Sequence, residues 1–176
     1  MNNEIITIGI VFSFILGTLL HFTYKIFNNN RFIGYFSAIN ESVWEHIKLS
    51  IFPILIFMLI IICFNYENIN NLFFSLGFSL LLSLTLVPSI FYSYTYITKK
   101  PVLIIDISIF ILAVILPFLL IKFITNLPPL PNFFEILGIL LTTLIILSFF
   151  ILPIIHLILN YLFNIQQKAR NSKFLA

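Results

Sequence analysis

The sequence predicts an all-α integral membrane protein, a helical bundle with five transmembrane helices. Hydrophobic residues make up 61% of the 176 residues, whereas only nine residues are basic and six are acidic. Soluble domains carry charge on roughly a quarter of their residues, so an ordinary soluble fold is excluded. The apolar residues also fall into long runs, and roughly 20 apolar residues let one helix cross a bilayer core about 30 Å thick.

Five apolar runs are long enough to span a membrane. Each is expected to be a helix, because a helix satisfies its own backbone polar groups where no water is present. The predicted spans are residues 5–24, 43–64, 72–97, 102–121 and 136–163. Residues 1–163 are therefore predicted to form a single membrane domain, followed by a short basic cytoplasmic tail at residues 164–176.

Polar or proline-containing connections separate these runs and justify each boundary in turn. The connections are residues 25–42, 65–71, 98–101 and 122–135. The last of them contains Pro128-Pro129-Leu130-Pro131, which makes it stiff. These segments leave no room for a separate soluble domain.

The basic residues predict the orientation of the bundle. Placing the connections on alternate sides puts eight basic residues on one side: Lys25, Arg31, Lys48, Lys99, Lys100, Lys168, Arg170 and Lys173. The opposite side has Lys122 alone. Cytoplasmic loops carry the excess of Lys and Arg, so the amino terminus is expected outside and the carboxyl terminus in the cytoplasm.

The net charge of +3 does not indicate a nucleic-acid partner. The basic residues are scattered between apolar runs and form no patch. The expected partner is the lipid bilayer, with a homo-oligomer or a larger membrane complex as further options. The single cysteine, Cys63, excludes an intramolecular disulfide and a zinc site built from several cysteines.

The densest polar segment, residues 40–48, opens the second span and has two interpretations. Ser42 and Glu45 have the spacing of a capping box, in which the Ser42 hydroxyl and the Glu45 carboxylate each accept from the other residue's backbone amide. The alternative is a functional site. Helical spacing groups Glu41 and Glu45 with Lys48, and places Ser42 and His46 on the adjoining face.

The predicted topology brings further polar residues to the same leaflet. His21 lies at the cytoplasmic end of the first span. Asp106 lies five residues into the fourth span from the same side, at a depth of roughly 7 Å. His156 lies twenty residues beyond Ile136 in the fifth span, which also brings it to the cytoplasmic boundary. A charge within the membrane marks a candidate functional residue. Imidazole and carboxylate groups also suit a divalent transition metal, although each of these residues could equally be an ordinary boundary residue. No more specific metal or catalytic motif is present.

The polar segment at the start of the second span belongs to a longer recognisable pattern. This pattern comprises His21-Phe22-x-Tyr24, a run from Phe36 to Leu49 and Pro53, and its specific part is Asn40-Glu41-Ser42-Val43-Trp44-Glu45-His46-x-Lys48. Asp106-Ile107-x-Ile109-Phe110 adds weaker support. On these residues the chain resembles a family of small prokaryotic multi-pass membrane proteins of unknown function. The resemblance adds Tyr24 as a candidate residue and implies a prokaryotic cell membrane, but it implies no reaction.

Three classes of function remain open. The first is a binding or accessory membrane component. The second is a membrane-embedded metal-dependent hydrolase, in which His21, His46 and Asp106 hold the metal and Glu45, with Glu41 nearby, acts as the catalytic carboxylate. The third is a small transporter or channel that uses Asp106 and Glu45 as a relay. Tyr24, Ser42 and His156 are supporting candidates, and no organic cofactor site is expected.

Overall fold

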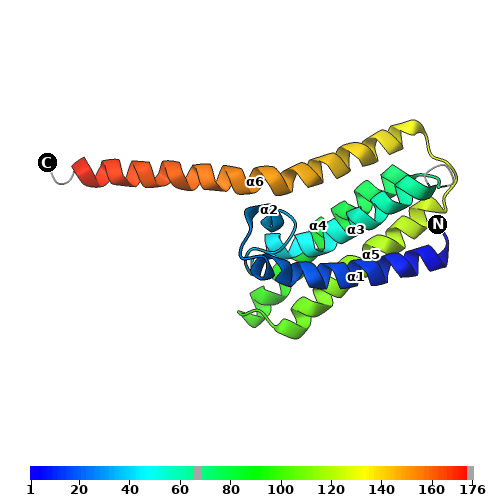
Figure 1. The fold of residues 1–176 in the computed structure, drawn as a ribbon, viewed down its shortest axis with the longest axis horizontal. Helices are drawn as coiled ribbons and strands as arrows, with labels where there is room; N and C mark the ends of the chain where they lie inside the picture. The colour runs from blue at the N-terminus through cyan, green and yellow to red at the C-terminus, as the bar shows by residue number, and fades with distance from the viewer. Residues whose placement is uncertain (66–68, 174–176) are drawn as a thin grey trace.

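The chain folds into an all-helical bundle, described here from a computed structural model (Figure 1). The structure describes the backbone of residues 1–65 and 69–173 and the side chains of residues 1–64 and 69–152, and it contains no β-strand over these ranges. The helices are α1 (Asn3–Ile26), α2 (Arg31–Gly34), α3 (Val43–Asn65), α4 (Leu72–Thr98), α5 (Leu103–Thr125) and α6 (Asn132–Lys173).

The prediction of five spans is confirmed. Within the described residues, α1, α3, α4, α5 and the part of α6 up to Leu152 are each long and apolar enough to cross a membrane. Two details differ from the prediction. The short helix α2 lies in a connection where no helix was predicted. Helix α6 continues to Lys173, so residues 164–173 extend this helix. The residues Gln, Lys, Ala and Arg in this segment all favour a helix.

Helix α3 is the centre of the bundle. In the membrane-spanning part of α3, 67% is buried inside the bundle, compared with 17–39% in the other four spans. It packs against α1, α4 and α5, and from Ile51 to Phe64 its sequence is apolar on all sides, as a helix surrounded by other helices requires. Ile51, Ile54 and Met58 on this helix are completely buried.

Helix α6 is attached to the bundle through α4 and then extends beyond it (Figure 1). The two helices meet at Gly77 and Gly138, where a Cβ on Gly77 would lie 2.5 Å from the Gly138 carbonyl oxygen. Small residues allow this close backbone approach, which is the usual basis of helix packing in membranes.

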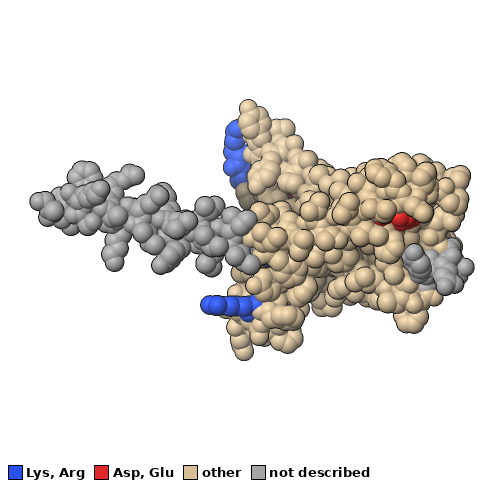
Figure 2. Space-filling view, turned by 90° about the horizontal axis from the view of Figure 1, so that it is seen from above, with Lys and Arg blue, Asp and Glu red and all other residues tan. Residues whose placement is uncertain are grey.

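The surface divides into an apolar belt and polar ends. Figure 2 shows Lys and Arg side chains gathered at one end of the face in view, whereas the wall between the ends carries almost no charge. The wall exposes large apolar side chains such as Ile8, Ile15, Leu119 and Leu144. In water such a surface would be unfavourable, but it suits contact with lipid tails.

Candidate functional site

The site begins where α1 ends and the chain turns back toward α3. Asn28 and Asn29 have φ values of 51° and 59°, in the left-handed region that asparagine tolerates better than most residues. The next residue, Asn30, starts α2, because its side chain accepts a hydrogen bond from the Phe32 amide at 2.9 Å. Three consecutive asparagines therefore reverse the chain at the end of the bundle that contains His21.

Ser37 fixes this connection to the last turns of α1. Its hydroxyl donates to the Leu20 carbonyl oxygen and accepts from the Tyr24 amide at 3.1 Å. The Thr23 hydroxyl also lies 3.0 Å from it. Ser37 is completely buried, so these bonds hold the middle of the connection against the turn that carries His21.

The amino terminus of α3 has half of the predicted capping box. The Glu45 amide donates to the Ser42 hydroxyl at 3.3 Å, as predicted. The predicted return bond is wrong: the Ser42 amide donates instead to Asn40 Oδ1 at 2.9 Å. The Glu45 carboxylate turns inward, where Oε2 accepts from the Ile39 amide at 3.0 Å and from Lys48 Nζ at 2.8 Å.

Glu45 and Lys48 form a buried ion pair. Their exposed fractions are 6% and 1%, and Lys48 Nζ also donates to the Gly34 carbonyl oxygen at 3.0 Å. The predicted grouping of Glu41 with this pair is wrong. Glu41 precedes the first helical residue, so helical spacing does not govern its direction, and it contacts His46 instead.

His21, Glu41 and His46 come together in space. Each offers one ligand atom, and these atoms all lie within 4.8 Å of one another. The two imidazole rings are 5.4 Å apart between centroids, and His46 Nε2 lies 3.4 Å from Glu41 Oε2. The site is open to the surroundings, since 35% of the His46 side chain and 74% of the Glu41 side chain are exposed.

The hydrogen bond of His46 to Ser42 determines what the ring can do at this site. Nδ1 lies 2.9 Å from the Ser42 carbonyl oxygen, and a carbonyl can only accept, so Nδ1 carries the proton. In a neutral ring Nε2 then presents a lone pair to the Glu41 carboxylate. Two acceptors repel each other at this distance unless a proton or a metal cation lies between them.

The match to known families extends over nearly the whole chain. A family model described as a family of unknown function, DUF6512, matches residues 1–168. The chain belongs to this family. The predicted resemblance to a family of unknown function is thereby confirmed, and the match reaches well beyond the segment in which the similarity was strongest. No curated protein and no solved structure matches the chain.

Asp106 in this DUF6512 protein is not among the clustered ligand atoms. It lies in the first turn of α5, and the start of α5 lies at the same end of the bundle as the end of α1 (Figure 1). It accepts a hydrogen bond from the Tyr94 hydroxyl. The same hydroxyl accepts from the Val102 amide at 3.2 Å. Tyr94 therefore joins the end of α4 to the start of α5.

The remaining candidates have supporting positions or lie outside the described side chains. Ser42 supplies the carbonyl that orients His46 and the hydroxyl that caps α3. The Tyr24 ring lies against Gly34, where an added Cβ would come within 3.1 Å of ring atom Cε2. His156 falls on α6 beyond the residues whose side chains the structure describes.

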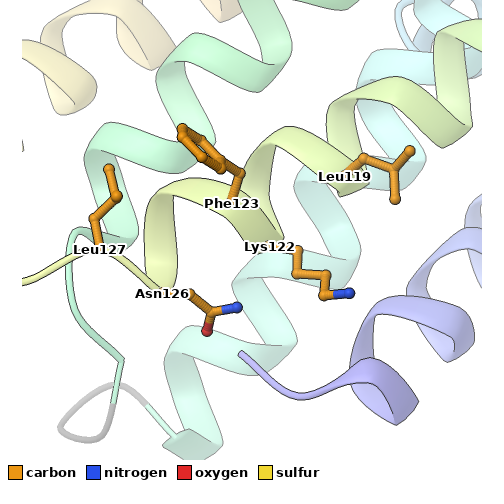
Figure 3. A pocket seen from close by; sticks show the side chains of 5 residues that line it. All are labelled: Leu119, Lys122, Phe123, Asn126 and Leu127. Atoms are coloured by element: carbon orange, nitrogen blue, oxygen red, sulfur yellow. The ribbon is translucent and has the colours of Figure 1, made fainter.

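A shallow hollow lies at the opposite end of the bundle (Figure 3). One face of α5 and the two residues after it line this hollow, through Leu119, Lys122, Phe123, Asn126 and Leu127. Asn126 Oδ1 accepts from the amino-terminal ammonium at 3.0 Å, so part of its polar surface is already engaged. None of the candidate residues from the sequence lies here, and the lining suggests no reaction.

Two residues that organise the site were not identified from the sequence. Ser37 fell within the run from Phe36 to Leu49 that carries the family resemblance but was not singled out, and Gly17 was not considered. A signal for Gly17 was present: it lies four residues before His21 on the same helix face. In the structure α1 approaches the backbone of α3 at this glycine.

Proposed function

We propose that this protein is an integral membrane protein that binds a divalent transition-metal ion through His21, Glu41 and His46. The observation that carries the proposal is the convergence of three ligand atoms from α1, the connection and α3 within 4.8 Å. Two imidazoles and one carboxylate suit Zn²⁺, Fe²⁺, Mn²⁺ or Co²⁺. The protein would thus belong to the class of binding components, with the metal as its ligand.

One pair of ligand atoms already has the separation that a metal requires, within a set that spans up to 4.8 Å. Bonds of about 2.1 Å in a tetrahedral site place neighbouring ligand atoms about 3.4 Å apart. His46 Nε2 and Glu41 Oε2 are 3.4 Å apart. The Ser42 carbonyl also supplies the outer hydrogen bond that metal-binding histidines usually make, because it holds the Nδ1 proton and leaves Nε2 free.

Three protein ligands leave at least one coordination position for water or another molecule. The general-base role considered for Glu45 receives no support, because its Oε2 is bonded to Ile39 and Lys48. Asp106 is bonded to Tyr94. The proposal is therefore limited to metal binding, and it requires neither the hydrolase nor the relay.

We also propose that the site faces the cytoplasm. Lys48 is buried and paired, so it does not contribute to the surface charge from which the orientation was predicted. Lys25, Arg31, Lys99 and Lys100 remain at the end that holds the site, whereas Lys122 is at the other end. This bias still favours an external amino terminus.

Titration of the purified, metal-free protein with Co²⁺ tests the metal site. We expect one Co²⁺ per chain, with visible absorption bands typical of mixed nitrogen and oxygen ligands, and displacement by Zn²⁺. His21→Gln and His46→Gln should each weaken binding by more than about 100-fold, because direct ligands matter more than the outer partners whose loss costs 10- to 100-fold. Asp106→Asn is the control and should bind normally.

Two results would overturn the metal proposal. One is the absence of stoichiometric binding by the wild-type protein. The other is binding that survives replacement of both histidines. In either case the contact between Glu41 and His46 would be an ion pair with a protonated ring, and Glu41→Gln would change only the free energy of unfolding.

A further inference from the structure

The connection that carries Glu41 is held on both sides by buried polar groups. On the α3 side, Lys48 Nζ binds the Gly34 carbonyl at 3.0 Å, and Glu45 Oε2 binds the Ile39 amide at 3.0 Å. These two contacts bracket residues 34–39, which end two residues before Glu41. The ion pair of Glu45 with Lys48, at 2.8 Å, joins these two contacts.

The α1 side of the same segment is attached to the helix turns around His21. Ser37, in the middle of residues 34–39, bonds to the Leu20 carbonyl and the Tyr24 amide. One short segment is therefore fixed to the turn of α1 that carries His21 and to the turn of α3 that carries His46. Glu41 follows this segment directly, so its position relative to both histidines depends on these anchors.

A buried ion pair is an unusual way to obtain stability alone. Removing two charges from water carries a desolvation penalty that their attraction often fails to offset, and apolar residues of similar size are frequently as stabilising. Lys48 is completely enclosed and Glu45 nearly so. What this pair provides, and apolar side chains cannot, is two directed bonds to the backbone on either side of Ser37.

We propose that Glu45 and Lys48 are positioning residues that place the Glu41 carboxylate against His21 and His46 for metal binding. This inference rests on the proposed metal site. Neither residue touches the metal. Lys48 holds the start of the segment at Gly34, Glu45 holds its end at Ile39, and the bond between the two side chains fixes the distance between these points.

A double-mutant cycle distinguishes positioning from general stabilisation. The Co²⁺ affinity is measured for wild type, Lys48→Met, Glu41→Gln and the double variant. Lys48→Met should weaken binding about 10- to 100-fold, as the loss of other outer-shell partners does. If Lys48 acts through Glu41, Glu41→Gln should cause little further loss in the Lys48→Met background, and the Co²⁺ spectrum of Lys48→Met should resemble that of Glu41→Gln.

Ser50→Ala is the matched control for loss of a buried polar group on α3. The Ser50 hydroxyl is completely buried and bonds to Ser83 Oγ at 2.7 Å, away from the connection. In this background Glu41→Gln should retain its full effect on Co²⁺ affinity. If Lys48→Met does not fold, the same cycle is run with the variant that carries both Glu45→Met and Lys48→Met, which removes both anchors and leaves no unpaired buried charge.

The outcomes separate the two proposals. If wild type does not bind Co²⁺, the metal site and the inference both fail. If wild type binds and Glu41→Gln weakens binding by the same factor in the wild-type and Lys48→Met backgrounds, the metal site stands and the positioning role is rejected. We expect the effects of Glu41→Gln and Lys48→Met on Co²⁺ affinity to be non-additive, and those of Glu41→Gln and Ser50→Ala to be additive.

Discussion

The backbone carbonyl oxygen of Leu49 lies 2.2 Å from the point that a Cβ at position 17 would occupy. Only glycine fits at position 17 without moving α1 away from α3. The contact lies one turn from His21 on α1 and three residues from His46 on α3. The close approach of these two helices therefore sets the separation of the two imidazoles.

Gly17→Ala should weaken both folding and metal binding. The added methyl group must push α1 and α3 apart, and overpacking of this kind lowers the free energy of unfolding by about 1–3 kcal/mol. The shift also separates His21 from His46, so we expect Co²⁺ affinity to fall about tenfold or more. Detergent-based thermal unfolding and Co²⁺ titration measure the two effects.

Gly77→Ala provides the control for this substitution. Its Cβ would lie 2.5 Å from the Gly138 carbonyl oxygen, between α4 and α6. It should lower stability similarly but leave Co²⁺ affinity unchanged. Equal losses of affinity in the two variants would show that the contact at Gly17 has no specific role in placing the histidines.

Metal affinity should decrease as the pH falls. Protons compete with the metal for both imidazoles and for the Glu41 carboxylate, so binding releases protons. We expect progressive weakening of Co²⁺ binding from about pH 8 to about pH 5.5. In His46→Gln the remaining Co²⁺ affinity should depend less steeply on pH, because one of the groups for which protons and metal compete is absent. Binding that is independent of pH would exclude imidazole ligands.

Tyr94→Phe and Asp106→Asn should affect stability but not metal binding. The Tyr94 hydroxyl connects Asp106 and the Val102 amide at the junction of α4 and α5. Loss of a hydrogen bond to a charged or partly buried group costs about 1–3 kcal/mol of unfolding free energy. Weaker Co²⁺ binding by Asp106→Asn would instead make Asp106 a ligand, as the sequence suggested.

Glu135→Gln should destabilise the packing of α4 with α6. Glu135 Oε2 accepts from the Phe73 and Phe74 amides at 2.8 and 3.2 Å, and so caps α4 from another helix. Asn71, at the N-cap position, makes no side-chain cap of its own. We expect a loss of about 1–2 kcal/mol in thermal unfolding. Glu4→Gln, at an exposed position in the first turn of α1, should change stability much less.

The orientation can be tested by cysteine labelling in a Cys63→Ser background. Lys100→Cys, between α4 and α5, should react with a membrane-impermeant maleimide only after the cells are opened. Pro129→Cys, between α5 and α6, should react in intact cells, because both positions are exposed but lie at opposite ends of the bundle. The reverse labelling pattern would place the metal site outside.

The sequence by itself determined the five spans of this protein, since long apolar runs must become helices wherever water is absent. It also placed His21, His46 and Asp106 at one end of the bundle. Successive spans cross the membrane in alternate directions, so the order of the spans along the chain is enough to assign each residue to an end. Only the tertiary structure decided which of these residues meet. Asn28 and Asn29 turn the chain, Ser37 and Lys48 anchor it, and Gly17 lets α1 approach α3. Because side-chain direction outside a helix follows such contacts and not a periodic spacing, Glu41 joins the histidines, Glu45 pairs with Lys48, and Asp106 bonds to Tyr94.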